Sequence, residues 1–211
     1  MPNDNPSVLI IDDDPEFRAS VALLLQTVDL HTREFSSVSD FLKAEPSNGP
    51  TCLVLDVRMP GRSGLELQRD LAAANRQVPI IFITAHADVP MTVQAMKGGA
   101  IEFLTKPFRD QDLIDAVEAG IARDRARRDS DRAQAALRER FDSLSSRERE
   151  IMLHVMAGRL NKQIAHDIGI TESTVKVHRT NLMRKMKAHS LPELSRMAHL
   201  LNLTPPRSQS A

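Results

Sequence analysis

Three consecutive aspartates, Asp12, Asp13 and Asp14, follow the short apolar run of residues 8–11. Like charges side by side repel one another, and burial increases that repulsion. A divalent cation held by two of these carboxylates would relieve it. For the run alone, two simpler interpretations stay open: solvated loop acids, or a cap for the helix that begins at Pro15.

Three further side chains with useful chemistry lie at the ends of other apolar runs. Asp56 is near the end of CLVLDV, Thr84 ends PIIFIT, and Lys106 comes just after IEFL. In an open α/β sheet, the carboxyl ends of parallel strands meet at one edge, where ligands bind. The sequence therefore predicts one site that combines carboxylates, a hydroxyl and an amine.

Phosphoryl transfer is the chemistry that this set of side chains favours. Mg2+ in proteins accepts a few carboxylates together with phosphate oxygens and water. We expect Asp13 and Asp56 to ligate it directly, and Asp12 to act directly or through water. A carboxylate beside a cation can attack a phosphoryl group. Lys106 would neutralise charge on the equatorial oxygens, and Thr84 could donate its hydroxyl to the finished acyl phosphate.

Alternating strands and helices must position these residues. Short apolar runs, typical of parallel strands covered on both faces, occur at residues 8–11, 30–35, 52–57, 79–84 and 101–104. Apolar residues at helical spacing, such as Phe17 and Val21, lie between them. Residues 1–121 therefore predict an α/β domain with a doubly wound, five-stranded parallel sheet.

Residues 122–143 predict a solvated helical linker, because they alternate charges of both signs and contain no Pro or Gly. Leu137, Phe141 and Leu144 form a short apolar stripe near its end. The stripe could pair with a second copy, although packing on the neighbouring domain is the favoured interpretation.

Residues 144–211 predict a small all-α domain with a disordered tail, TPPRSQSA. Ser145 begins the first helix with a capping box. Helices over residues 161–168 and 172–186 are joined by a tight turn at Gly169, which is the spacing of a helix-turn-helix, and a fourth helix ends near Leu203.

The third of these helices has two different sides. Its core side carries Val175, Leu182 and Met186. The opposite side carries hydroxyls, cations and a small apolar group: Ser173, Lys176, Val177, Thr180, Arg184 and Lys187. Such a side suits the major groove of DNA, although an ordinary solvated helix has a similar pattern.

Charge is distributed unevenly along the chain. Residues 1–121 carry eighteen acidic and ten basic side chains, whereas residues 144–211 carry eleven basic and five acidic ones. This asymmetry predicts two domains with different partners and suits a polyanion for the second. No apolar run is long enough for a membrane span, no signal peptide is recognisable, and the single Cys52 excludes an internal disulfide, so we expect cytoplasmic residence.

Residues 7–122 resemble the receiver domain of two-component response regulators, which has a flavodoxin-like fold. The resemblance rests on DDD at 12–14, LDVRMPGRSG at 55–64, FITAH at 82–86 and EFLTKPF at 102–108. The stretches MPGRSG and DVPMTVQAMKGGAIEFLTKPF are similar to the FixJ-like subgroup.

This resemblance implies a role for each of the candidate residues. Asp56 would be the phosphoacceptor, Lys106 the phosphate-binding lysine, and Thr84 and Phe103 a coupled switch pair. The Mg2+ ligands would be Asp12, Asp13, Asp56 and the backbone carbonyl of Arg58. A cis peptide would join Lys106 to Pro107.

Residues 144–186 resemble the NarL/LuxR-type helix-turn-helix, through NKQIA at 161–165, STVK at 173–176 and His178. In that family the exposed side of the third helix reads the major groove. The resemblance therefore implies DNA contacts, with Lys176, Val177 and Thr180 at base-facing positions. Lys162, Thr171, Thr174 and Lys185 are candidate phosphate contacts, and Arg184 on the same exposed side completes the set. We expect His178 to be a packed structural residue.

Together the two resemblances imply a phosphorylation-activated transcriptional regulator and no enzyme beyond its own phosphoryl transfer and dephosphorylation. Its partners would be a sensor histidine kinase, double-stranded promoter DNA and RNA polymerase. Phosphorylation would promote a homodimer, or dimers would exist beforehand and be regulated through the linker helix.

An alternative from another class uses the same aspartates. Asp12 and Asp14 have the Asp-x-Asp spacing of haloacid-dehalogenase-type phosphatases, as nucleophile and acid–base. However, Pro15 stands where Thr or Val normally follows, the later paired acids of that family are missing, and Asp56 would have no role. We therefore favour the regulator.

Overall fold

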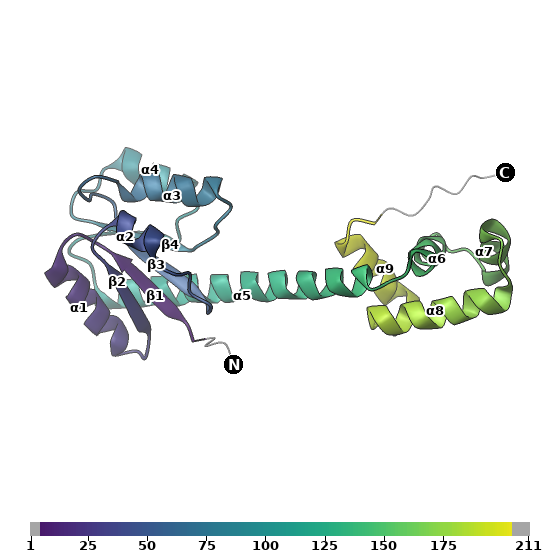
Figure 1. Ribbon diagram of the computed structural model, residues 1–211. Helices are drawn as coiled ribbons and strands as arrows, with labels where there is room; N and C mark the ends of the chain where they lie inside the picture. Colours follow the sequence, from purple (N-terminus) through teal and green to yellow (C-terminus); the bar gives the residue numbers. More distant parts are fainter. Residues whose placement is uncertain (1–4, 204–211) are drawn as a thin grey trace. The chain divides into compact units, whose positions relative to one another are not determined.

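The computed structural model describes residues 5–203, and two compact units divide the chain between Asp129 and Ser130. The first unit is a sheet flanked by helices, and the second is helical (Figure 1). The strands are β1 (Ser7–Ile11), β2 (His31–Phe35), β3 (Thr51–Asp56), β4 (Ile80–Thr84) and β5 (Glu102–Thr105). The helices are α1 (Pro15–Gln26), α2 (Val38–Lys43), α3 (Gly64–Ala73), α4 (Val89–Lys97), α5 (Asp110–Asp142), α6 (Ser146–Met156), α7 (Asn161–Ile168), α8 (Glu172–Met186) and α9 (Leu191–Leu200).

The five strands pair in parallel in the order β2-β1-β3-β4-β5, so the predicted doubly wound sheet is confirmed. The strand order reverses between β1 and β3, which is the switch point where open α/β sheets bind ligands. Ile11 pairs with Leu55, so the residues that follow β1 reach the level at which β3 ends.

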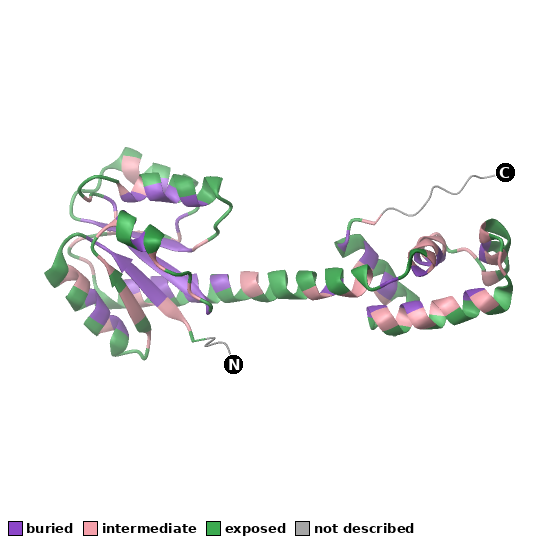
Figure 2. Cartoon of the chain, viewed as in Figure 1, coloured by how far each residue is buried: buried purple, intermediate pink, exposed green. Residues whose placement is uncertain are grey.

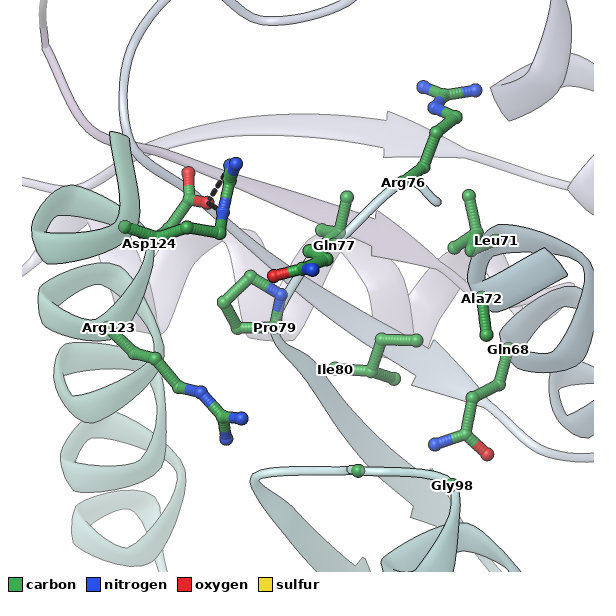
Figure 3. Close-up of a pocket in the computed structure, with 13 residues that line it drawn as sticks. Gln68, Leu71, Ala72, Arg76, Gln77, Pro79, Ile80, Gly98, Arg123 and Asp124 are labelled. Atoms are coloured by element: carbon green, nitrogen blue, oxygen red, sulfur yellow. Dashed lines mark hydrogen bonds and ion pairs between the residues drawn. The ribbon is translucent and has the colours of Figure 1, made fainter. Parts of the chain in front are cut away.

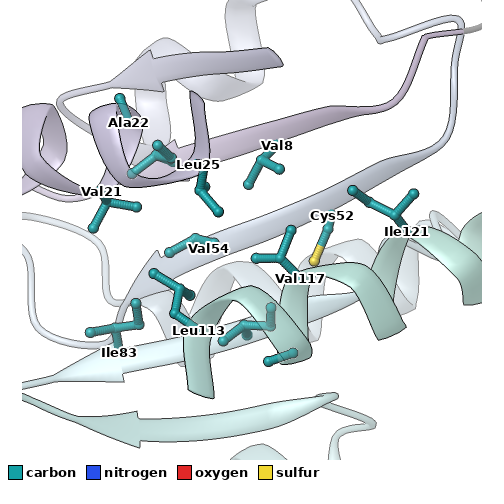
Figure 4. Packing of buried hydrophobic residues seen from close by; sticks show 13 residues of the cluster. Val8, Val21, Ala22, Leu25, Cys52, Val54, Ile83, Leu113, Val117 and Ile121 are labelled. Atoms are coloured by element: carbon teal, nitrogen blue, oxygen red, sulfur yellow. The ribbon is translucent and has the colours of Figure 1, made fainter. Parts of the chain in front are cut away.

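Each face of the sheet has its own covering helices. On one face, Val8 and Val54 pack against Val21 and Leu25 of α1 and against Leu113 of α5, as Figure 4 shows. On the other face, the alternate strand residues pack against α2, α3 and α4. Figure 2 shows the resulting burial along the strands. Coverage on both faces explains why the sequence of the central strands is continuously apolar.

Helix α5 runs without a break through the last helix of the first unit and through all but the final residue of the predicted linker, residues 122–143. Asp124 accounts for the extension of the first unit beyond residue 121, because its side chain is only 2% exposed and ties the helix to the sheet. It accepts a hydrogen bond from the backbone N–H of Thr51 at 2.9 Å and others from the guanidinium groups of Arg127 and Arg128, both at 2.6 Å. Figure 3 shows Asp124 beside the loop that precedes β4.

The second unit packs around one apolar cluster, whose fully buried members include Ile151, Ile164 and Leu182. The stripe of Leu137, Phe141 and Leu144 packs on this cluster, which confirms the favoured interpretation. Between α7 and α8 the chain turns at Gly169, whose φ of 68° lies in the left-handed region that glycine adopts readily. Thr171 caps α8 by accepting a hydrogen bond from the backbone N–H of Thr174.

Some predicted element bounds were wrong by a few residues. Leu30, which we expected in a strand, instead donates its backbone N–H to Leu25 and closes the turn after α1. The last helix ends at Leu200 rather than near Leu203. Apolar spacing did not locate the residues of helix α2, because six residues show little periodicity. The predicted disordered tail, residues 204–211, lies outside the described residues. Within residues 5–203, none of the helices combines the length and the apolar composition of a membrane span.

Candidate functional site

Three carboxylates meet where β1 and β3 end. One carboxylate oxygen from each of Asp12, Asp13 and Asp56 lies within 4.8 Å of the other two. Asp12 is buried, Asp56 is half-buried and Asp13 is exposed, so the cluster opens to solvent on one side. The predicted convergence of these residues is therefore confirmed, and its oxygen donors are of the kind that Mg2+ prefers.

The pKa of Asp56 is raised above its ordinary value. Burial is the main cause, and the negative charges of Asp12 and Asp13 add to it. The backbone N–H of Arg58, which donates to Oδ1 at 3.2 Å, and the Lys106 ammonium act in the opposite direction. Because a cation would remove this penalty on the ionised form, the cluster fits a divalent metal.

Lys106 follows β5 and directs its ammonium group into the acidic cluster. Its Nζ donates to Oδ2 of Asp12 at 2.7 Å and lies 3.4 Å from the centroid of the Phe17 ring. The ring of Phe108 meets that of Phe17 edge-on, with the centroids 6.1 Å apart. The peptide bond between Lys106 and Pro107 is cis, as the resemblance implied. From the sequence, Phe17 was visible only as one of the apolar positions of a helix.

The two predicted switch residues lie on neighbouring strands. Thr84 ends β4, and its buried hydroxyl oxygen accepts a hydrogen bond from the backbone N–H of His86 at 3.3 Å. Phe103 in β5 is half-buried and pairs in register with Phe82, with the ring centroids 6.2 Å apart. The strands that carry Thr84 and Phe103 are therefore paired through their backbones. The role of these two residues as a coupled switch pair stays a prediction.

Asp14 lies outside the acidic cluster and caps α1. Its Oδ1 accepts hydrogen bonds from the backbone N–H groups of Glu16 at 2.9 Å and Phe17 at 3.2 Å. The helix cap that was left open for the aspartate run is therefore confirmed for Asp14. A side chain engaged in this way does not take the acid–base position that the phosphatase alternative would require of it.

The predicted base-facing residues share one exposed side of α8. Val177 is 60% exposed, and Lys176 and Thr180 are exposed beside it. The ammonium of Lys176 lies 3.5 Å from a carboxylate oxygen of Glu172, which is a weak surface pair that DNA could displace. Arg184 on α8 and Lys162 on α7 are also exposed, so these side chains are accessible to a polyanion.

Lys185 has a structural partner that the sequence did not reveal. Its ammonium donates to Oε2 of Glu148 at 2.7 Å and to the carbonyl of Ser143 at 3.2 Å. Burial by itself raises the pKa of Glu148, but hydrogen bonds from Lys185 and from Ser145 reverse this effect and leave the pKa lowered. The residues lie 37 positions apart, so no local pattern could have paired them.

Arg179 also has an unexpected role in holding the helices together. Its guanidinium donates to Oδ1 of Asn161 at 2.5 Å and so joins α8 to the first residue of α7. The hydroxyls of Thr171 and Thr174 lie 2.7 Å apart at the start of α8, where their mutual hydrogen bond accompanies the helix cap. Their predicted contacts with DNA phosphates would therefore involve hydroxyls that are already positioned by the fold.

A cavity of about 280 Å3 lies beside the start of β4, at the opposite ends of the strands from the carboxylates. Its lining includes Gln68, Pro79, Gly98 and Arg123 (Figure 3). None of the site residues predicted from the sequence lines it. The cavity is therefore separate from the acidic cluster at the carboxyl ends of the strands.

Two family models match this chain in the same order as its two compact units. The response regulator receiver domain matches residues 8–118, and the luxR family of bacterial regulatory proteins matches residues 142–198. The first match contains the whole acidic cluster together with Thr84 and Lys106. The second contains α6, α7 and α8.

Individual relatives are similar over nearly the whole chain. Nodulation protein W of Bradyrhizobium diazoefficiens is 48% identical over 197 residues, which cover 93% of this chain and 87% of that protein. Transcriptional regulatory protein FixJ of Azorhizobium caulinodans is 44% identical over 205 residues, which cover 97% of each chain. The solved structure of response regulator StyR has a TM-score of 0.87 and 45% identity, and covers 92% of this chain and 98% of that one. The chain therefore belongs to the response regulators of two-component systems, in the FixJ-like group of transcriptional regulators that join a receiver domain to a LuxR-type DNA-binding domain.

Proposed function

We propose that Asp56 accepts a phosphoryl group from a sensor histidine kinase. The observation that carries this proposal is the cluster of three carboxylates beside the Lys106 ammonium. In the transfer, a carboxylate oxygen of Asp56 attacks phosphorus, the bond from phosphorus to the imidazole nitrogen of the donor breaks, and the imidazole takes up a proton. Attack of water on the acyl phosphate would release inorganic phosphate and restore the carboxylate. Beyond this reaction on itself, we propose no enzymatic activity.

The metal that fits the cluster is Mg2+, held by the side chains of Asp12, Asp13 and Asp56 and by the backbone carbonyl of Arg58. When bound, Mg2+ would offset the negative charge of the carboxylates and of the phosphoryl oxygens. Lys106 supplies a second positive charge to the phosphoryl group from the end of β5. The nearby hydroxyl of Thr84 would turn from its present hydrogen bond to a phosphoryl oxygen.

Phosphorylation would change the surface formed by α4, β5 and the start of α5. That surface carries three exposed apolar side chains on α4: Val89 at 76%, Val93 at 45% and Met96 at 43% exposure. We propose that movement of Thr84 and Phe103 reshapes this surface and promotes a homodimer. The alternative is a dimer that precedes phosphorylation and is regulated through the linker helix. Sedimentation at several protein concentrations, with and without a phosphoryl donor, distinguishes the two.

The exposed side of α8 would then bind the major groove of promoter DNA. We propose that Lys176, Val177 and Thr180 contact base edges, and that a second set contacts phosphates: Lys162, Thr171, Thr174, Arg184 and Lys185. Two recognition helices in a dimer can occupy successive major-groove half-sites. Bound to a promoter, the dimer would act on RNA polymerase, and a protein with this role works in the bacterial cytoplasm.

The test measures binding of the full chain to promoter fragments that carry paired half-sites, with and without acetyl phosphate and Mg2+. We expect acetyl phosphate to tighten binding by wild type and by Asp14→Asn, which keeps the helix cap, but not by Asp56→Asn. Phosphorylation that leaves both DNA affinity and sedimentation unchanged would contradict the proposed coupling. Equal tightening in Asp56→Asn would contradict the assignment of the phosphoacceptor.

A further inference from the structure

We infer that Phe17 is a positioning residue that holds the Lys106 ammonium in place for the phosphoryl group. This inference rests on the proposed function of Lys106 and concerns a side chain that would touch neither the metal nor the phosphoryl group. The geometry that carries it is a cation over an aromatic face. Lys106 Nζ lies 3.4 Å from the Phe17 ring centroid, well inside the range of about 6 Å for such contacts.

The surroundings of the pair favour a strong contact. The Lys106 side chain is 20% exposed, so water competes little for its ammonium group. The Phe17 ring is itself fixed from the side, because Phe108 meets it edge-on at an interplanar angle of 88°. The backbone of Phe17 is fixed as well, since its N–H donates to the capping carboxylate of Asp14 at the start of helix α1. Cation–π attraction is larger where the cation is desolvated.

An aromatic ring suits this position better than a second carboxylate would. The charged partner of Lys106 in this structure is Asp12, whose carboxylate is also a proposed ligand of Mg2+. Metal binding would offset the negative charge of that carboxylate and so weaken its attraction for the ammonium group. The ring carries no net charge and leaves the N–H donors of the ammonium group available for a phosphoryl oxygen. Phe17 would therefore keep Lys106 in the site without competing with the phosphoryl group.

A double-mutant cycle in the full chain tests the inference. We expect Phe17→Leu to lower the rate of phosphorylation by acetyl phosphate, and the affinity for beryllofluoride in Mg2+, by about three- to tenfold. Phe17→Tyr keeps an aromatic face and should restore most of both. The matched control is Phe35→Leu, because Phe35 also has an edge-on aromatic neighbour and a cation over its ring, and it should change neither value.

The decisive comparison is made in a Lys106→Met background. There, Phe17→Leu should have no further effect, because its role acts through the ammonium group. An equal loss in both backgrounds would overturn the inference and leave Phe17 as a packing residue. If Lys106→Met itself has no effect, the proposed function of Lys106 is wrong and the inference falls with it.

A measurement on wild type tests the inference even if a variant does not fold. The ring current of Phe17 should shift the resonances of the Lys106 Cε protons upfield, and this shift should persist when Mg2+ is added. Return of those resonances to their ordinary position on addition of Mg2+ would show that the ammonium group leaves the ring. That result would contradict the inference even if every variant were unstable.

Discussion

Replacing Asp56 by Asn is expected to stabilise the receiver domain when no metal is bound. In wild type one carboxylate oxygen from each of Asp12, Asp13 and Asp56 lies within 4.8 Å of the other two. Two unit charges at that separation repel by about 3.5 kcal/mol at an effective dielectric constant of 20 and by about 0.9 kcal/mol in water. Because Lys106 offsets part of the repulsion and the cluster opens to solvent, we expect a gain of about 1–2 kcal/mol. Asn keeps the oxygen that accepts the backbone N–H of Arg58.

Differential scanning calorimetry of the full chain is the suitable assay, since the sequence has no Trp or Tyr to report unfolding by fluorescence. For a domain of this size, each kcal/mol raises the midpoint by about 4 °C, so the receiver transition should rise by about 4–8 °C. Added Mg2+ should raise the transition of wild type and have a smaller effect on Asp56→Asn. Asp14→Asn, next to the cluster in sequence but outside it, should leave the midpoint unchanged.

The sign of the pH dependence provides a second check. The raised pKa of Asp56 means that its neutral form is favoured in the folded protein, so the penalty appears as the pH rises through that pKa. The advantage of Asn should therefore be largest at pH values above the pKa of Asp56 and disappear as the pH falls below it. A midpoint for Asp56→Asn at or below that of wild type at pH 7 without metal would refute this account of the acidic cluster.

Three further predictions follow from other parts of the chain. Asp124→Ala should destabilise the receiver domain by about 3–5 kcal/mol in urea unfolding, because it removes the buried carboxylate that pairs with Arg127 and Arg128. A loss below about 1 kcal/mol would contradict the role given to Asp124. Lys185→Met should lower the stability of the DNA-binding domain by about 3 kcal/mol at pH 7. The loss should shrink as the pH falls through the lowered pKa of Glu148, with calorimetry as the readout and equal loss at neutral and acidic pH as the contrary result. Arg184→Ala should reduce the salt slope of DNA binding by about one without changing sequence preference, whereas Thr180→Ala should alter the preference at one base pair; the reverse assignment of these effects would show that α8 sits differently in the groove.

The sequence was most informative about residues at the ends of strands. Asp12, Asp56 and Lys106 could be predicted to converge because parallel strands end at one edge of the sheet. Helical periodicity located the helices of both domains except α2. The burial of Asp124 could not be predicted, because this residue lies among alternating charges. Its burial depends on a backbone N–H of β3 that is far away in the sequence. The pairing of Lys185 with Glu148 was hidden for the same reason.

Phe17 shows a different limit of sequence reasoning. Its position in an apolar helical pattern explains its packing against the sheet, but the pattern contains nothing about the face that the ring presents to Lys106. Local periodicity specifies which side of a helix is buried. It does not specify which of the buried side chains meets a functional group from a distant strand.

The most direct test of the central claim is the intact mass of the protein after treatment with acetyl phosphate. We predict that wild type gains the mass of one phosphoryl group in Mg2+ and none in excess chelator. Asp56→Asn should gain none in either condition, whereas Asp14→Asn should behave as wild type. A gain that survives in Asp56→Asn, or that is independent of the divalent cation, would contradict the assignment of Asp56 and its neighbouring acids as the metal-dependent phosphoacceptor site.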